Sequence, residues 1–459
     1  MSLENKKRIF ICAEHGRALV YFLQSEVVKT LLAGGAELVL LTDDEALPAI
    51  EARFRQPGVA FEGMRLGACK RYFATKNHFL QYWLHVLRGT GGSNRVNTTA
   101  IDGNYQVIVT AARGRRKLVI PVIRVLVWLM RRSRAVRQAV VGLQRRFTPS
   151  IYTDLFEKHR PDLVLTSTPG WLLDRYLLRE AAARGVPTAT VIVGWDNPSS
   201  YRLNGGPVDE ITCWSEIHKE ELVQGADWDP GKVAINGNPA YDGYFRKEWL
   251  IGREEYFRLH GLDPQRRLLA YACSFETFHP NFQNIAAIAD LVNQEALDQP
   301  CQLLIRLHPN HFQPGSRFEG EANRVRDFIR AMPHVRLVEP VSLSGSLGHY
   351  SGEDMPEKTS MMAHADVFLT VYSTMVVETA IHDRPIVAVC IDVPGGWNLP
   401  GIYSLPLTAI GDWPTHLRFR QAGAGRVAVN KEEVRQHVNF YLRQPQADGP
   451  ARRKFIQEE

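Results

Sequence analysis

The chain has 459 residues, of which 45% are hydrophobic and 23% charged, and its formal net charge is +6. At about 150 residues per domain, this length predicts two or three domains, and the ordinary composition excludes disordered and fibrous proteins. The net charge is modest for the length, so only its distribution along the chain can indicate an acidic partner.

The apolar runs predict neither a membrane-spanning helix nor a secretion signal. The longest run, residues 118–130, is interrupted by Pro121 and Arg124 and falls short of the roughly 20 residues that cross a bilayer. The polar, basic start of the chain lacks the apolar stretch of a signal peptide, so we expect a cytoplasmic protein. The six cysteines form no CxxC pair, which favours buried thiols over disulfides or a zinc site.

Short β-branched runs alternate with helical patterns, which is typical of βαβ units and parallel sheets. In the first half we expect strands near residues 8–13, 37–42, 162–166, 189–194, 210–214 and 232–235. In the second half they recur near residues 268–273, 302–307, 335–338, 367–371 and 386–391. Helices are expected over residues 19–32 and 171–184, and residues 242–262 form a charged helical segment.

This alternation predicts an α/β fold of two doubly wound, Rossmann-like domains that face each other across a cleft. We expect the domains to span residues 1–245 and 246–459, because turn residues at 236–239 and the charged segment separate the two series of strands. The last helix is a candidate to pack back on the first domain. Ligands of such sheets bind at the carboxyl ends of strands, so candidate site residues are sought there.

Two strand ends of the second half carry groups that can bind phosphate. His308 follows the strand at 302–307, and an imidazole there can donate to an anion. Ser373 and Thr374 stand where a helix begins after the strand at 367–371, a position that favours negative charge. Glu378 lies one turn later and can accept from a ribose hydroxyl. The alternatives are a surface histidine and an ordinary helix cap.

Two strand ends of the first half carry candidate acid–base groups. Asp196 follows the strand at 189–194 beside Trp195, which suits a general base, although Asp-Asn-Pro is also a good turn sequence. Glu14 and His15 follow the first strand and are further candidates for the base, with Arg17 as an anion contact. A loop histidine without such a role is the alternative.

Other motifs are weak or absent. There is no GxxxxGK[ST] phosphate loop, and Gly423-Ala424-Gly425 lacks the third glycine of a dinucleotide fingerprint. Asp227-Trp228-Asp229 has the spacing of a metal-binding DxD but precedes a Pro-Gly turn, so we expect a loop and no metal or other cofactor. The acidic run at 43–45 is expected to be a solvated loop, with contact to an acceptor as the alternative.

Four blocks in chain order resemble glycosyltransferases of the GT-B fold. They are residues 191–200, 209–216 together with 233–245, 306–309 and 365–385. The similarity is to the bacterial capsule and surface-polysaccharide transferases and, more distantly, the CDP-glycerol glycerophosphotransferases of wall teichoic acid synthesis. It implies an acceptor-side first domain and a second domain that binds a nucleotide sugar. It also implies that His308, Ser373 and Thr374 hold the donor phosphates, with Arg306 nearby.

Two motifs differ from those of the teichoic acid enzymes and make glycerophosphate transfer the weaker hypothesis. Those enzymes have Trp-His-Gly where this chain has Trp195-Asp196-Asn197, and Asp-Tyr-Ser-Ser where it has residues 371–374. The sequence therefore favours a sugar transferase acting on a surface glycan or lipid-linked acceptor, with Asp196 as the base. The alternatives are a nucleotide-sugar 2-epimerase, a polyol-phosphate transferase and an inactive nucleotide-sugar-binding protein.

One stretch of the chain concentrates positive charge. Residues 103–153 contain eleven Lys and Arg residues and no Asp or Glu. We expect an apolar helix here, with residues 119, 120, 123, 127 and 130 on one face, to contact an anionic membrane surface on the inner face of the membrane. Its expected contacts are Trp128, Arg131, Arg132 and Arg134. The main alternative is a core helix followed by a solvated basic helix. Nucleic-acid binding is a third alternative, which is less favoured because no recognised nucleic-acid-binding fold accompanies the charge.

Overall fold

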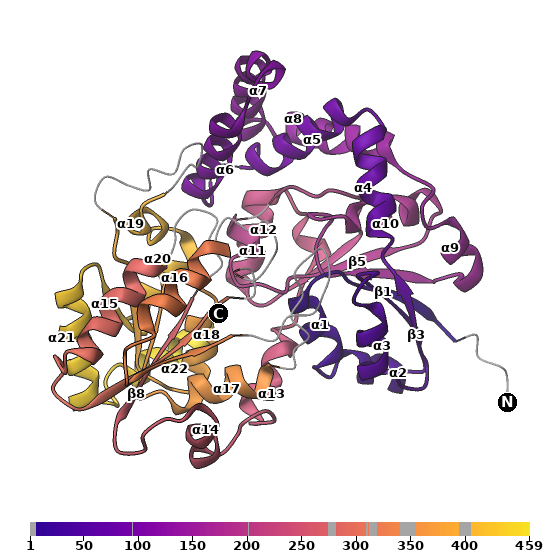
Figure 1. Ribbon diagram of the computed structural model, residues 1–459. Helices are drawn as coiled ribbons and strands as arrows, with labels where there is room; N and C mark the ends of the chain where they lie inside the picture. The colour runs from indigo at the N-terminus through magenta and orange to yellow at the C-terminus, as the bar shows by residue number, and fades with distance from the viewer. Residues whose placement is uncertain are drawn as a thin grey trace. The chain divides into compact units, whose positions relative to one another are not determined.

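The computed structural model describes residues 6–93, 95–200, 202–273, 281–308, 311, 319–339, 354–393 and 405–459. It divides into two compact units, each with its own parallel sheet (Figure 1). Among the described residues, unit 1 runs to Ala240 and unit 2 begins at Tyr241, whereas the sequence placed this boundary after residue 245. Both sheets are wrapped by helices, so the predicted α/β fold of two doubly wound units is confirmed.

Unit 1 contains seven parallel strands in the order β3-β2-β1-β4-β5-β6-β7. Their bounds are β1 (Arg8–Ala13), β2 (Glu37–Thr42), β3 (Val59–Gly63), β4 (Leu163–Thr166), β5 (Thr188–Val191), β6 (Glu210–Cys213) and β7 (Val233–Ile235). Because the order reverses between β1 and β4, the switch point of the sheet lies between these two strands.

Alternate residues of the central strands form two separate cores. Phe10 and Cys12 of β1 pack on one face with Phe156 and Leu177, whereas Ile9 and Ile11 pack on the other face. Side chains alternate along a strand, so a sheet covered on both faces needs continuous apolar runs. This requirement explains why the central strands could be recognised in the sequence.

The helices of unit 1 cover both faces and add a separate group. Those near the sheet are α1 (Gly16–Leu23), α2 (Val27–Ala33), α3 (Leu47–Phe54), α4 (Leu66–Thr75), α9 (Thr153–His159), α10 (Asp174–Ala183), α11 (Asn197–Ser200) and α12 (Glu216–Ala226). The group comprises α5 (His78–Thr90), α6 (Thr98–Ala111), α7 (Arg115–Arg132) and α8 (Arg134–Leu143). Figure 1 shows these four helices together, apart from the sheet of the unit.

The first predicted helix is divided in the structure. Residues 19–32 were expected to form one helix, but α1 ends at Leu23 and α2 begins at Val27. The Ser25 hydroxyl donates to the carbonyl of Tyr21 and accepts from the amide of Val27 at 3.2 Å. These local bonds replace helical ones, which is how serine interrupts a helix.

The inner face of α7 belongs to the protein core. Ile123, Val127 and Met130 are buried and pack with Trp83 and Leu87 of α5. Arg131 makes an ion pair with Asp102 and is largely buried. The face that we expected to contact a membrane therefore faces the core, and Arg131 is not available at the surface.

Unit 2 contains six parallel strands in the order β10-β9-β8-β11-β12-β13. Their bounds are β8 (Arg267–Ala272), β9 (Cys301–Arg306), β10 (Val335–Val338), β11 (Val367–Thr370), β12 (Ile386–Val389) and β13 (Arg426–Ala428). The switch point lies between β8 and β11. The main core joins β8, β9 and β11 to helices on one face of the sheet, among them α15 (Phe282–Asn293), α16 (Glu319–Ile329) and α21 (Lys431–Arg443).

The remaining helices of unit 2 are α13 (Asp242–Phe245), α14 (Arg253–His260), α17 (Met355–His364), α18 (Met375–Ile381), α19 (Leu407–Ile410), α20 (Pro414–Ala422) and α22 (Gly449–Glu458). The charged segment at 242–262 is thus two helices, separated where Lys247 adopts a left-handed conformation with φ 56°. The last helix, α22, packs against α18 and α20 of its own unit.

Candidate functional site

The switch point of unit 1 is bridged by His15. His15 follows β1 and Ser167 follows β4, and His15 Nε2 lies 3.2 Å from Ser167 Oγ. His15 Nδ1 accepts from the amide of Ala18 at 3.3 Å, which caps the start of α1. Because Nδ1 accepts, a neutral imidazole carries its proton on Nε2, and His15 therefore donates to Ser167. In this state His15 is a hydrogen-bond donor at the strand ends.

Asp196 lies at the carboxyl end of β5, next to β4 in the sheet. Asp196 is partly exposed as a whole residue, while Trp195 beside it is fully buried. Burial raises the pKa of Asp196, and the positive charge of Arg17 partly opposes this. Arg17 lies against the loop at Gly194, where an added Cβ would be 2.8 Å from Arg17 Nη1. The structure thus gathers His15, Arg17 and Asp196 at neighbouring strand ends.

Glu14 has a different environment from the other two base candidates. It is fully buried at the end of β1, and its Oε2 accepts from the amide of Asp174 at 3.1 Å. Burial raises the pKa of Glu14, and the negative charge of Asp174 raises it further. Asp174 itself accepts from the Thr168 hydroxyl at 2.6 Å. Glu14 is therefore a buried carboxyl group with a raised pKa and a structural hydrogen bond, and the candidates that solvent reaches are His15 and Asp196.

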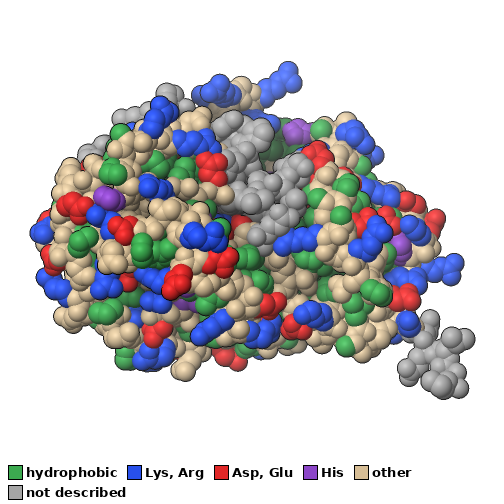
Figure 2. Space-filling model, turned by 60° about the horizontal axis from the view of Figure 1, so that its bottom comes forward, with side chains coloured by type: hydrophobic (Ala, Val, Ile, Leu, Met, Phe, Trp, Pro, Cys, Tyr) green, Lys and Arg blue, Asp and Glu red, His purple; other side chains and the backbone are tan. Residues whose placement is uncertain are grey.

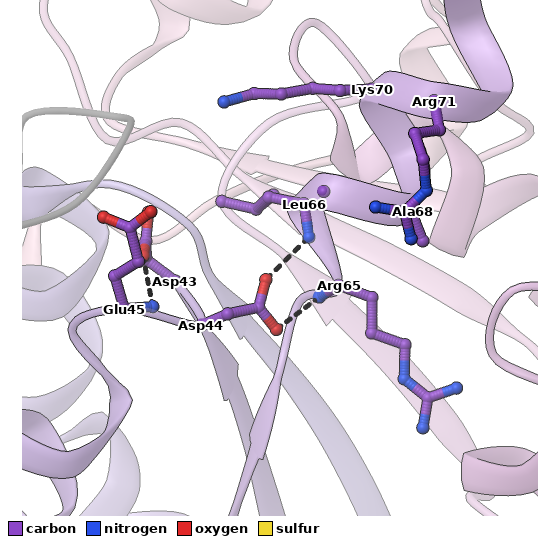
Figure 3. A pocket seen from close by; sticks show the side chains of 9 residues that line it. Asp43, Asp44, Glu45, Arg65, Leu66, Ala68, Lys70 and Arg71 are labelled. Carbon is purple, nitrogen blue, oxygen red and sulfur yellow. Dashed lines mark hydrogen bonds between the residues drawn. The ribbon is translucent and has the colours of Figure 1, made fainter.

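A pocket of about 540 Å³ opens at the same edge of the sheet, beyond β2 (Figure 3). Asp44 holds the start of α4, because its two carboxylate oxygens accept from the amides of Arg65 and Leu66 at 2.9 and 2.7 Å. Gly63 permits this arrangement, since an added Cβ would collide with Asp44. Glu45 on one side and Lys70 on the other are exposed. Together they can accept from and donate to the hydroxyl groups of a sugar.

The phosphate-binding candidates of unit 2 lie at the carboxyl edge of its sheet. His308 follows β9, and Ser373 and Thr374 follow β11, on opposite sides of β8. Two strand spacings separate β9 from β11, which is about 10 Å. Ser373 Oγ accepts from the amide of Met375 at 3.2 Å, a local bond one residue before Thr374, which is the N-cap of α18. A hydroxyl that accepts in this way still has its proton to donate.

Arg306 and Glu378 both have buried ionic partners within unit 2. Arg306 pairs with Asp354, and among the described residues neither Arg306 Nη1 nor Asp354 Oδ1 has a hydrogen-bond partner. Glu378 pairs with Lys358 and accepts from the Tyr244 hydroxyl at 2.7 Å. A ribose that binds Glu378 would have to share it with these two groups. Arg306 retains an N–H group for an anion at the end of β9.

The two carboxylates of the DxD motif make hydrogen bonds within the protein. Both carboxylate oxygens of Asp227 accept from Arg137 at 2.6 Å, and Asp229 accepts from the amide of Gly231 at 3.0 Å. In the parts of the chain that the structure describes, no group of His, Cys, Asp and Glu side chains could hold a metal ion. The DxD motif therefore forms a turn that is tied to α8.

No protein-family model and no curated protein matches the sequence. Solved structures match almost the whole chain. They include a glycosyltransferase from Rickettsia africae, with a TM-score of 0.51, 12% identity, and coverage of 99% of this chain and 94% of that chain. UDP-GlcNAc 2-epimerase from Neisseria meningitidis, bound to UDP-GlcNAc, has a TM-score of 0.51, 12% identity and coverage of 98% of both chains. The same enzyme from Methanocaldococcus jannaschii matches with a TM-score of 0.50, 11% identity and 98% coverage of both chains.

These comparisons establish the class of fold. The chain has the two-domain α/β architecture of GT-B proteins. In fold it is similar both to a glycosyltransferase and to UDP-GlcNAc 2-epimerases. At such low identity the likeness concerns the fold alone. The finer resemblance to capsule and glycerophosphate transferases rests on the sequence motifs only.

Part of the candidate site was not predicted from the sequence. Arg65, Lys70 and Arg71, which line the pocket of unit 1, were not singled out. Arg65 directly precedes α4, and Lys70 and Arg71 lie in it; α4 follows an edge strand that was also missed. The acidic run at 43–45 was the one available signal, because it follows a recognised strand and lies at the same edge.

Proposed function

We propose that the protein is a glycosyltransferase that transfers a sugar from a nucleotide-activated donor to a surface glycan or a lipid-linked acceptor. The observation that supports this most directly is the division of chemistry between the strand ends. Unit 1 carries His15 and Asp196, which can handle a proton, whereas unit 2 carries His308 and Ser373, which can bind phosphate. The GT-B fold is compatible with this division.

In the proposed reaction Asp196 deprotonates the acceptor hydroxyl, which then attacks the anomeric carbon of the donor sugar. The bond between the sugar and the phosphate breaks, and the nucleoside diphosphate leaves with the bonding electrons. His308, Ser373 and Thr374 stabilise the charge that develops on the leaving phosphate. These donors supply the stabilisation without a metal ion. The setting is polysaccharide biosynthesis in the cytoplasm.

A nucleotide-sugar 2-epimerase is the second candidate, because two of the structural neighbours described above are epimerases. A thermal-shift screen with UDP-, GDP-, CDP- and CMP-linked sugars identifies the donor. Incubation with that donor alone then separates the two reactions. With the donor alone, a transferase leaves the sugar of the donor unchanged, whereas an epimerase converts it to an isomer. Measurable binding without any turnover would favour an inactive binding protein.

Donor affinity is expected to fall by about one to two powers of ten in His308→Ala and in Ser373→Ala, because each variant loses a hydrogen bond to a charged phosphate worth roughly 1.5–3 kcal/mol. Calorimetric titration with the identified donor measures the change. His334→Ala is the matched control, since His334 precedes β10 and lies at the opposite edge of the same sheet. Wild-type affinity in both test variants, with the fold intact, would rule out this phosphate site.

A further inference from the structure

The outer face of α7 is an exposed apolar stripe. Leu118, Val122, Val125, Trp128 and Leu129 are 79%, 59%, 58%, 53% and 36% exposed. Four of them recur at the spacing of one helix face, and Trp128 lies beside them. The opposite face of α7 is already buried against α5. The helix is therefore apolar on two sides, of which only one is covered by the protein.

Basic side chains lie along one flank of this stripe and at its C-terminal end. Lys117 and Arg124 are exposed and lie seven residues apart along one flank. Arg132 lies over the Trp128 ring, with its guanidinium carbon 4.5 Å from the ring centroid. None of these three has an acidic partner among the described residues, and residues 103–153 contain no acid. On the face of the molecule shown in Figure 2, by contrast, acidic and basic side chains are mixed.

We infer that the outer face of α7 docks on an anionic lipid surface. An interfacial helix presents an apolar face with tryptophan to the acyl boundary and places its cations among the headgroups. No described helix, α7 included, combines the length and hydropathy that a bilayer crossing requires. The helix would therefore lie in the plane of the interface. This inference goes beyond the proposed sugar transfer and is independent of it.

Charge favours a lipid surface over a second copy of the chain. Two copies that packed through the same stripe would bring Lys117, Arg124 and Arg132 of each chain close together. Like charges at an interface oppose association, and the stretch offers no carboxylate to compensate them. An anionic bilayer complements both properties of the face, because it accepts apolar side chains and attracts cations.

Sedimentation with vesicles tests the inference without any nucleotide sugar, so its outcome is separate from that of the transferase assay. The wild-type chain should pellet with vesicles of phosphatidylcholine and phosphatidylglycerol, but not with phosphatidylcholine alone, and added salt should weaken the binding. The charge variant combines Lys117→Gln, Arg124→Gln and Arg132→Gln. Its affinity should fall about a hundredfold, since each basic residue near an anionic surface contributes to binding.

The matched control removes the same charge elsewhere. It combines Arg330→Gln, Arg443→Gln and Lys454→Gln, whose side chains are 78%, 62% and 76% exposed in unit 2. It should bind vesicles like the wild type. A second variant, called the apolar variant because it replaces apolar residues of the stripe, combines Val122→Ser, Val125→Ser and Trp128→Ser and should also lose binding. If this variant does not fold, the charge variant still decides the test.

Three results would overturn the inference. The first is a protein that stays in the supernatant with anionic vesicles at low salt. The second is equal loss of binding in the charge variant and the control, which would show non-specific attraction. The third is a dimer in analytical ultracentrifugation that the apolar variant abolishes while vesicle binding is absent, because a second copy would then cover the stripe.

Discussion

Replacing Asp196 with asparagine is expected to lower turnover by roughly 10²–10⁴-fold and to leave donor affinity nearly unchanged. The amide cannot accept the proton of the acceptor hydroxyl, whereas the proposed phosphate contacts lie in unit 2. Steady-state kinetics with the identified donor and acceptor measures kcat, and calorimetric titration of the donor measures affinity separately.

The pH profile gives an independent measurement of the same residue. Burial raises the pKa of Asp196, so the carboxylate is protonated at a higher pH than an exposed aspartate, whose pKa is about 3.9. The base must be ionised, so activity should fall as the pH decreases through this raised pKa. The Asp196→Asn variant should lose that acid limb from its residual activity.

Three other variants complete the Asp196 experiment. Asp229→Asn removes a carboxylate from an exposed turn and should keep normal turnover. His15→Asn keeps a side-chain oxygen that can cap α1, so its kinetics report the imidazole rather than helix stability. Near-normal turnover in Asp196→Asn with collapse in His15→Asn would assign the base to His15. If both variants and Glu14→Gln remain active, the base lies elsewhere.

Replacing Arg137 with methionine is expected to lower the free energy of unfolding by about 3–5 kcal/mol. Arg137 and Asp227 form a buried pair, with side chains 9% and 5% exposed, through two hydrogen bonds of 2.6 Å. Arg137 also donates to the carbonyl of Met130 at 2.7 Å. The substitution leaves a buried carboxylate without its cation, and urea denaturation measures the loss.

An exposed pair provides the control for Arg137. Arg330 and Asp327 are 78% and 67% exposed, so Arg330→Met should change stability by about 1 kcal/mol or less. Adding Asp227→Asn to Arg137→Met removes the unpaired charge and should recover part of the loss. Equal, small effects in both single variants would show that the buried pair contributes little.

The central strands were predictable because they are buried on both faces. The bounds of β1, β2 and β10 match the sequence expectation to the residue. The edge strands β3 and β13 are only partly buried and were missed, whereas the edge strands β7 and β10 were predicted. The break between α1 and α2 was also missed, because it depends on hydrogen bonds of Ser25 that compete with a strong helical pattern.

The location of the candidate site followed from topology, whereas its partners did not. Residues that follow parallel strands lie at one edge of their own sheet, so the positions of His15 and Asp196 in unit 1 and of His308 and Ser373 in unit 2 could be anticipated. The partners of Glu378 come from α13 and α17, which are distant in sequence. For α7, composition identified an apolar basic helix, but only packing against α5 decided which face is exposed.

The helices inserted between β3 and β4 have a small entropic cost for unit 1. Pairing of β1 with β4 joins Ile9 to Leu163, 154 residues apart (163 − 9), whereas the equivalent pairing in unit 2 joins Leu269 to Val367, 98 residues apart (367 − 269). Loop-closure entropy grows with the logarithm of length, so the longer connection costs only about 0.4 kcal/mol more. The connection therefore accommodates its extra helices, α7 among them, with little entropic penalty on the pairing of β1 with β4.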